Sequence, residues 1–175
     1  MNLQTRFGIS IWFIPSKETT TKLTTIISKL SKKYSSPLFE PHITLSKHIK
    51  ITDKIVDIFK NNFKELKEFE MEVINVDQDN KYFKCLFLSL KISEEFKEAI
   101  KISEKLFKGE QPEVNPHLSL IYGNMPENER KELVISLSKE LKDIKKIKIK
   151  KVKLYITKGS VYTWKELASI SLIKK

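Results

Sequence analysis

The sequence predicts an α+β fold made of two related lobes, each a mostly antiparallel sheet with helices on its outer side and with a cleft between the lobes. Segments that alternate apolar and polar residues, as strands do, are mixed with segments whose apolar residues recur at helical spacing. The order strand, helix, strand, helix, strand occurs twice along the chain. Glycine is scarce, at four residues, and no Gly/Ser-rich linker separates the halves. We therefore expect residues 1–175 to form one bilobal domain.

The first three elements are a strand, a helix and a second strand. Residues 7–13, FGISIWF, alternate bulky side chains shortly before a proline and predict a strand. Residues 17–34 carry apolar side chains three and four positions apart, which predicts an amphipathic helix. A proline-containing break then leads to residues 42–49, HITLSKHI, whose alternation predicts the second strand.

A helix and a hairpin follow. Residues 52–66 have apolar side chains at helical spacing, and Thr52 is a candidate N-cap. Residues 69–76, FEMEVINV, alternate cleanly and predict a strand. The turn signal QDNK comes next, so we expect residues 82–92 to return as the second strand of an antiparallel hairpin.

The next helix, loop and strand repeat the earlier order. Ser93 is a candidate N-cap for a helix over residues 93–107. Residues 109–116, GEQPEVNP, have the composition of a loop. Residues 117–123, HLSLIYG, predict a short strand.

The last three elements are a helix and two strands. Pro126 is placed at a favoured early position of a helix over residues 125–144. Residues 146–157 alternate lysine with apolar residues, and the pair at 150–151 interrupts this alternation, which predicts a strand with a bulge. Residues 165–173 predict the final strand.

The composition narrows the class of protein. Hydrophobic residues make up 40% of the chain and aromatic residues 10%, which is typical of a globular protein rather than a disordered one. No apolar run approaches the length that crosses a bilayer, and the first residues lack the layout of a secretory signal. Cys85 is the only cysteine, so an intramolecular disulfide is excluded. We expect a cytoplasmic monomer with no membrane partner, and the nucleus is the alternative location.

The charge leaves two interpretations open. A net charge of +11 attracts polyanions over long distances, which favours nucleic acid as a partner. However, nearly all the positive residues are lysines, and Arg6 and Arg130 are the only arginines. Scattered lysine often serves solubility, whereas specific phosphate recognition favours arginine.

Two copies of one pattern carry the functional prediction. PHITL places His42 two residues before Thr44, and PHLSL places His117 two residues before Ser119. Residues i and i+2 of a strand point to the same face, so each histidine shares a face with a hydroxyl. Both copies follow a proline and occupy equivalent positions in the repeated element order. We therefore expect the two pairs to face each other across the cleft.

This quartet suits hydrolysis at phosphorus. A histidine can give or take a proton near neutral pH, so two of them can act as base and acid in one turnover. Hydroxyl groups can donate hydrogen bonds to the non-bridging oxygens of a phosphate. If both proton positions and the oxygens are served in this way, the reaction needs no metal and no cofactor.

Other site chemistries fit less well. A zinc site needs a third protein ligand, and Cys85 has no cysteine or histidine close to it in the sequence. Cys85 lies in an apolar strand segment, where it is expected to face the interior rather than to act as a nucleophile. No phosphate-binding glycine pattern occurs. Two positions after His48 the chain has Lys50 instead of a serine or threonine, and we interpret His48 as a bystander.

The two motifs resemble the paired His-x-Thr/Ser signatures of the two-histidine phosphoesterases. The likeness extends along the chain in the order and spacing of the plant and yeast cyclic phosphodiesterases of that superfamily. It is carried by the segments ISIWFIP (9–15), FEPHITL (39–45), YFKCLFLSL (82–90), PHLSLIYG (116–123) and TWKELASISL (163–172). The resemblance implies a metal-independent hydrolase that opens nucleoside 2′,3′-cyclic phosphates and ADP-ribose 1″,2″-cyclic phosphate, a by-product of tRNA splicing.

The resemblance also implies roles for particular residues. His42 and His117 match the acid/base pair, and Thr44 and Ser119 match the residues that bind the phosphate oxygens. Aromatic positions of the substrate pocket are matched by Trp12, Phe83 and Tyr122. We expect Trp12 and Tyr122 at the rim of the cleft, and the alternation of residues 82–88 would place Tyr82 and Phe83 on opposite faces.

Two alternatives remain at this stage. The same quartet could act on RNA ends that carry cyclic phosphates or on 2′,5′-oligoadenylates, which a basic groove would favour. A different class is a non-catalytic RNA-binding module, which predicts salt-sensitive RNA binding without turnover. Which histidine is the acid, and which oxygen leaves, is not visible in the sequence.

Overall fold

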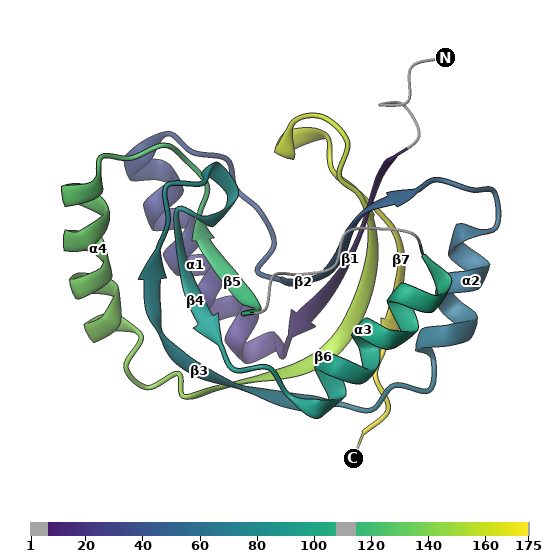
Figure 1. Cartoon of the computed structure of the whole chain (residues 1–175). Helices are drawn as coiled ribbons and strands as arrows, with labels where there is room; N and C mark the ends of the chain where they lie inside the picture. The colour runs from purple at the N-terminus through teal and green to yellow at the C-terminus, as the bar shows by residue number, and fades with distance from the viewer. Residues whose placement is uncertain (1–6, 108–114, 175) are drawn as a thin grey trace.

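A computed structural model describes residues 7–107 and 115–174, and within them it has one seven-stranded antiparallel sheet and four α-helices (Figure 1). The predicted α+β class is confirmed. The strands are β1 (Phe7–Pro15), β2 (Ile43–Lys50), β3 (Phe69–Gln78), β4 (Leu86–Leu90), β5 (His117–Ile121), β6 (Lys146–Ile156) and β7 (Lys165–Ser171). The helices are α1 (Lys17–Tyr34), α2 (Ile55–Phe63), α3 (Glu94–Leu106) and α4 (Glu127–Glu140), with short 3₁₀ turns η2 (Tyr82–Lys84) and η3 (Val161–Thr163).

The sheet curls so that its strands form two groups. The strand order is β1-β2-β5-β4-β3-β6-β7, and β6 also pairs with β1. The group β3, β4 and β5 lies toward the left of Figure 1, beside α1 and α4, whereas β1, β6 and β7 lie toward the right, with α2 and α3. Each group thus has its helices on one side, and the motif strand β2, which pairs with β1, joins the second group while β5 belongs to the first. The groups are joined by the pairing of β2 with β5 and by the pairing of β3 with β6.

One row of apolar side chains crosses most of the sheet and anchors it. The register aligns Val152 with Phe13, Phe13 with Ile43, Ile43 with Leu118, and Leu118 with Leu88. All five side chains are buried in the same hydrophobic core. Because neighbouring residues of a strand point to opposite faces, the next row along each strand lies on the face away from this core.

The helices follow their local signals, with one correction. Helix α1 has the predicted bounds, and the Ser16 hydroxyl accepts a hydrogen bond from the backbone N–H of Thr19 at 3.3 Å. The Ser93 hydroxyl caps α3 as predicted, accepting from the backbone N–H of Phe96 at 3.2 Å. Thr52 is not an N-cap, because α2 begins at Ile55 after Lys54.

The strands differ from the prediction at the start of β4 and match it at the bulge in β6. Residues 82–84 form the turn η2 rather than the start of a strand, so β4 is shorter than predicted. The bulge near Lys150 is confirmed, since Ile14 pairs with Lys151 while Pro15 pairs with Ile149. Most of the predicted loop 109–116 lies outside the described residues. In the described part of the chain, no helix is both long and apolar enough to cross a membrane.

Candidate active site

The pairing of β2 with β5 brings the two sequence motifs together. Ile43 is the register partner of Leu118 in this antiparallel pair. Continuing the register by one residue in each direction places His42 opposite Ser119 and Thr44 opposite His117. The four motif residues therefore form two cross-strand pairs on the face away from the core. Each histidine is therefore the cross-strand partner of the hydroxyl residue of the other copy.

The same face carries a polar row that continues beyond the motifs. Thr44 pairs with Trp12 of β1, and Trp12 pairs with Lys153 of β6. On the other side His117 pairs with Ser89 of β4. The row thus places a cation, an indole, a hydroxyl and an imidazole side by side, where the adjacent row has only apolar residues.

His42 is held firmly in one orientation. Its ring lies flat against the indole of Trp12, with centroids 3.7 Å apart and planes 11° apart. Its Nδ1 lies 2.6 Å from the backbone oxygen of Glu40. A carbonyl oxygen can only accept, so Nδ1 carries the proton and Nε2 presents a lone pair.

Burial keeps this imidazole neutral. The side chain is 7% exposed, and the loss of solvation lowers the pKa of His42 to about 4, although the hydrogen bond to Glu40 opposes the shift. A neutral ring with a free Nε2 is a proton acceptor at neutral pH. The environment of His42 is therefore that of a base.

A network of polar side chains stands behind His42 and Trp12. The Glu40 carboxylate accepts from Lys153 Nζ at 2.7 and 2.9 Å and from the Tyr155 hydroxyl at 2.9 Å. Lys153 also forms an ion pair with Glu166 at 2.9 Å. The Tyr155 ring stacks on Trp12 with centroids 4.0 Å apart. Glu40 is thus linked to His42 twice, directly through its carbonyl and indirectly through the stack of Tyr155 on Trp12.

The charges in this network support one another. Burial alone would lower the pKa of Lys153, but the hydrogen bonds to Glu40 and Glu166 outweigh it and raise that pKa. Burial and the hydrogen bond to Glu40 both raise the pKa of Tyr155. At neutral pH Lys153 therefore stays charged, and Tyr155 stays a hydrogen-bond donor.

The second motif has a different environment. The Ser119 hydroxyl donates to the backbone carbonyl of Phe83 at 2.8 Å, which ties β5 to the turn η2. The His117 ring meets the Phe87 ring edge to face, with centroids 5.3 Å apart. His117 is half-buried, so it is more accessible than His42. Ser119 must rotate its hydroxyl away from Phe83 before it can donate to a ligand.

The three predicted pocket aromatics differ in exposure. Trp12 and Tyr122 are each only 3% exposed, so neither ring stands open at a rim as we expected, whereas Phe83 is 52% exposed. The expectation that Tyr82 and Phe83 point to opposite faces is wrong, because the turn η2 brings their rings into edge-to-face contact at 5.0 Å. The pocket role of Trp12, Phe83 and Tyr122 stays a prediction.

Two aromatic residues near the motifs were not singled out from the sequence. Phe39 stacks on Tyr122 with centroids 3.8 Å apart and lies 6.3 Å from the His42 ring. Trp164 lies 5.6 Å from Trp12, and its indole Nε1 is buried without a hydrogen-bond partner among the described residues. Both lie in segments that carry the family resemblance. Phe39 is three residues before His42, and Trp164 directly precedes β7. A buried indole N–H without a partner is uncommon, and this one is closed to solvent in the structure.

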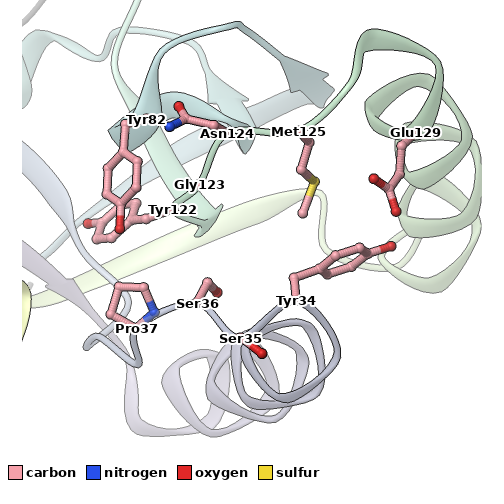
Figure 2. Close-up of a pocket in the computed structure, with 10 residues that line it drawn as sticks. All are labelled: Tyr34, Ser35, Ser36, Pro37, Tyr82, Tyr122, Gly123, Asn124, Met125 and Glu129. Carbon is pink, nitrogen blue, oxygen red and sulfur yellow. The ribbon is translucent and has the colours of Figure 1, made fainter.

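A pocket of about 350 Å³ adjoins these aromatic residues, and Tyr122 is one of the residues that line it (Figure 2). It lies between the end of α1, the turn η2 and the loop from β5 to α4, and the motif residues do not line it. Elsewhere, His48 is exposed and has a positive φ of 54°, in keeping with the bystander interpretation. Within residues 7–107 and 115–174, no three His, Cys, Asp or Glu residues are grouped so as to hold a metal ion.

Comparison with known proteins places this geometry in a family context. The chain matches the family described as "Cyclic phosphodiesterase-like protein" over residues 7–172. It is 28% identical over 124 residues to the cyclic phosphodiesterase of Arabidopsis thaliana, covering 70% of this chain and 68% of that one. It is 27% identical over 118 residues to a 2′,3′-cyclic-nucleotide 3′-phosphodiesterase of Candida albicans, covering 57% of this chain and about half, 48%, of that one.

Solved structures share the fold at low sequence identity. E. coli LigT complexed with 3′-AMP superposes with a TM-score of 0.58 at 9% identity, covering 95% of this chain and 98% of that one. Kluyveromyces marxianus Usb1 superposes with a TM-score of 0.50 at 12% identity, covering 96% and 98%. The family match and these folds together confirm the predicted likeness to the two-histidine phosphoesterases.

Proposed function

Because this chain belongs to the cyclic phosphodiesterase-like family, we propose that it is a hydrolase that opens cyclic phosphodiesters. Its substrates in this proposal are nucleoside 2′,3′-cyclic phosphates, which become 2′-phosphates, and ADP-ribose 1″,2″-cyclic phosphate, which becomes the 1″-phosphate. The observation that carries the proposal is the register of β2 with β5, since it assembles both histidines and both hydroxyls on one face.

His42 is the base in the proposed reaction. Its Nδ1 proton is donated to the Glu40 carbonyl, so Nε2 is the nitrogen that accepts a proton from water. The depressed pKa, about 4, keeps His42 in the proton-accepting form at neutral pH. The oxygen of this water attacks phosphorus as the bond from phosphorus to the 3′ oxygen breaks.

His117 is the acid that completes the step. The departing 3′ oxygen carries negative charge and takes a proton from the His117 imidazolium. The proton gained by His42 and the proton lost by His117 balance over one turnover, and solvent resets both. The half-buried position of His117 allows this exchange with water.

Thr44 and Ser119 bind the non-bridging oxygens of the phosphate. Each hydroxyl sits opposite the histidine of the other motif, so the phosphate lies among all four side chains. The protein then carries out both proton transfers and binds both non-bridging oxygens, so the step balances without a metal.

The direct test is hydrolysis of 2′,3′-cyclic AMP by the wild-type protein, by His42→Ala and by His117→Ala, with a chelator present. We expect wild-type turnover to persist in the chelator, and each single variant to lose it by about 10²-fold or more. A His48→Asn variant is the matched control and retains turnover. Normal turnover in either motif variant contradicts paired acid/base catalysis, and loss of wild-type turnover in the chelator contradicts metal-independence.

A longer substrate is the second candidate. The pocket beyond Tyr122 favours substrates that extend past the cyclic phosphate, such as RNA ends or 2′,5′-oligoadenylates. Comparing a mononucleotide with an oligomer of each linkage separates these candidates. A non-catalytic RNA-binding module instead requires salt-sensitive RNA binding with no turnover of any of them.

A further inference from the structure

The pocket beside the motif face has walls of tyrosine. The rings of Tyr34, Tyr82 and Tyr122 surround it from three different elements, and Figure 2 shows Tyr82 and Tyr122 together at one end with Tyr34 at the other. Pro37 and Ser36 form its floor between them in this view. Its volume of about 350 Å³ is at the lower end of the range for small-molecule sites.

We propose that this pocket is a second binding site, which takes a nucleobase with an exocyclic amine, preferably adenine. This base belongs to the unit joined to the nucleotide or ribose that carries the cyclic phosphate, and not to the nucleotide that reacts. The inference rests on the proposed function and adds to it a preference for substrates larger than a mononucleotide.

The tyrosine walls favour a flat, aromatic ligand. Every base offers a π face, and stacking on aromatic side chains is the common way in which proteins hold single nucleobases. The Tyr82 side chain is 39% exposed, so its ring is accessible to a ligand. Tyr122 is buried, and burial raises the pKa of its phenol, so it backs the pocket as a neutral ring with little surface of its own for stacking.

The lining of the pocket offers no cation to a phosphate and one carboxylate to a hydrogen-bond donor. Glu129 is the only residue with a carboxyl side chain among the lining residues, and no lysine or arginine belongs to that lining. Lys33 lies near, with its ammonium 4.9 Å from the centre of the Tyr34 ring, but does not line the pocket. The negative end of the α1 dipole is also here, because α1 ends at Tyr34. An exocyclic amine suits both features, and a phosphate suits neither.

A second polar group in the pocket lacks a protein partner. The Ser36 hydroxyl lines the pocket and is buried, with no hydrogen-bond partner among the described residues. Buried hydroxyls are nearly always paired, and rotation of the Ser36 side chain toward the pocket would let a ligand atom pair with this one. Ser36 and Glu129 together offer a base one donor-acceptor hydroxyl and one acceptor carboxylate.

The position of the pocket assigns it to the neighbouring unit. Tyr122 forms a wall of the pocket and stacks on Phe39 at 3.8 Å, and Phe39 in turn lies 6.3 Å from the His42 ring. The rings of Tyr122 and Phe39 therefore lie between the pocket and His42, the proposed general base. In the reacting nucleotide one sugar bears both the nucleobase and the cyclic phosphate, so that nucleobase stays close to His42. A nucleobase beyond both aromatic rings therefore belongs to the next unit of the substrate.

The test compares three substrates in the full chain. They are 2′,3′-cyclic AMP, the dinucleotide ApA with a 2′,3′-cyclic phosphate end, and ADP-ribose 1″,2″-cyclic phosphate. We expect Tyr82→Ala and Glu129→Gln to raise KM for the dinucleotide by about tenfold and to leave KM for 2′,3′-cyclic AMP within about twofold. The ADP-ribose arm shows whether its adenine uses the same pocket. Glu127→Gln, on the same turn of α4 but outside the pocket, leaves all three unchanged.

Base identity gives a second readout. Wild-type protein should prefer ApA over UpA with the same cyclic end, because uracil has no exocyclic amine, and Glu129→Gln should reduce this preference. Equal losses on mononucleotide and dinucleotide would assign the pocket to the reacting nucleotide and overturn the inference. Unchanged KM values for both longer substrates would also overturn it.

The pocket can be tested even if the proposed hydrolase activity is wrong. If wild-type protein turns over none of the three substrates, the proposed hydrolase activity fails, and the pocket is then tested by binding alone. Titration of ApA bearing a terminal phosphate, followed by intrinsic fluorescence, should show weaker binding in Tyr82→Ala than in Glu127→Gln. Equal binding by these two variants would reject the pocket independently of catalysis.

Discussion

The imidazole of His42 lies flat on the indole of Trp12, with ring centroids 3.7 Å apart and an angle of 11° between the planes. Tyr155 covers Trp12 as well, at 4.0 Å, and leaves the indole 3% exposed. An indole so enclosed has little surface to offer a substrate base. We infer that Trp12 acts by positioning His42.

The first prediction separates this positioning role from a pocket role. Trp12→Phe shortens the stacking surface under His42, so we expect kcat on 2′,3′-cyclic AMP to fall about tenfold with KM within about twofold. Steady-state kinetics measure both constants, and circular dichroism checks that the variant is folded. A higher KM with an unchanged kcat would return Trp12 to the substrate pocket that the family resemblance implies.

The second prediction concerns stability and pH. The pKa of His42 is about 4 in the folded protein and 6.5 ordinarily, so below pH 6.5 the unfolded chain binds a proton that the folded chain does not. The free energy of unfolding should therefore fall as pH falls from about 6.5 to about 4, by about 3 kcal/mol from this group. Urea unfolding at pH 7.5 and 4.5 measures the change.

A His42→Gln variant should lose this part of the pH dependence. Acidic side chains contribute equally to both proteins, so the difference between wild type and variant isolates His42. His48→Asn is the control, since asparagine tolerates the positive φ at that position and the residue is exposed. Equal slopes for wild type and His42→Gln would mean that His42 is not kept neutral by burial.

The third prediction concerns the network behind the site. Lys153→Met leaves Glu40 with Tyr155 as its remaining partner from this network, so the segment that holds His42 Nδ1 is less constrained. We expect kcat to fall about tenfold and the free energy of unfolding to drop by about 1–3 kcal/mol. The ¹⁵N chemical shifts of the His42 ring report whether its Nδ1–H tautomer is still fixed.

The same strand provides a matched control for this variant. Lys150 pairs with Glu68 at 3.1 Å, and Glu68 keeps Lys148 at 3.2 Å when Lys150 is lost, just as Glu40 keeps Tyr155. Lys150→Met should therefore leave kcat and the His42 shifts unchanged. Similar kinetic losses in Lys150→Met and Lys153→Met would reduce the role of Lys153 to general stability.

The fourth prediction compares the two hydroxyls. Thr44→Val and Ser119→Ala each remove one donor to the phosphate, so each should lower kcat by about 10²–10³-fold. Ser119→Ala also removes the hydrogen bond to the Phe83 carbonyl, and hydrogen exchange at residues 82–84 should increase in this variant alone. If neither variant loses activity, the hydroxyls do not bind the phosphate oxygens.

Local signals gave most of the elements because they act over a few residues. Helix 17–34 carries its own cap and apolar stripe, and it forms with those bounds. The errors occurred where distant contacts override the local pattern. Residues 82–84 alternate like a strand, yet they turn where the Phe83 carbonyl accepts from Ser119 and the Tyr82 carbonyl accepts from the backbone N–H of Gly123.

The motif residues were visible in the sequence, but their support was not. Lys153 and Tyr155 share a face by simple alternation, yet nothing local indicates that Glu40 is their partner. Phe39 and Trp164 are likewise ordinary aromatics until the fold places them beside Tyr122 and Trp12. Long-range pairing of this kind leaves no periodic signature in a single chain.

The sequence by itself determined which side chains share a face. The spacing of two between His42 and Thr44, and between His117 and Ser119, fixes this through the pleat of a strand. Only the tertiary structure decided that the two strands are neighbours in one register and that His42 is buried against Trp12. The physical reason is that strand pairing and desolvation depend on what packs around a residue, and those partners come from distant parts of the chain.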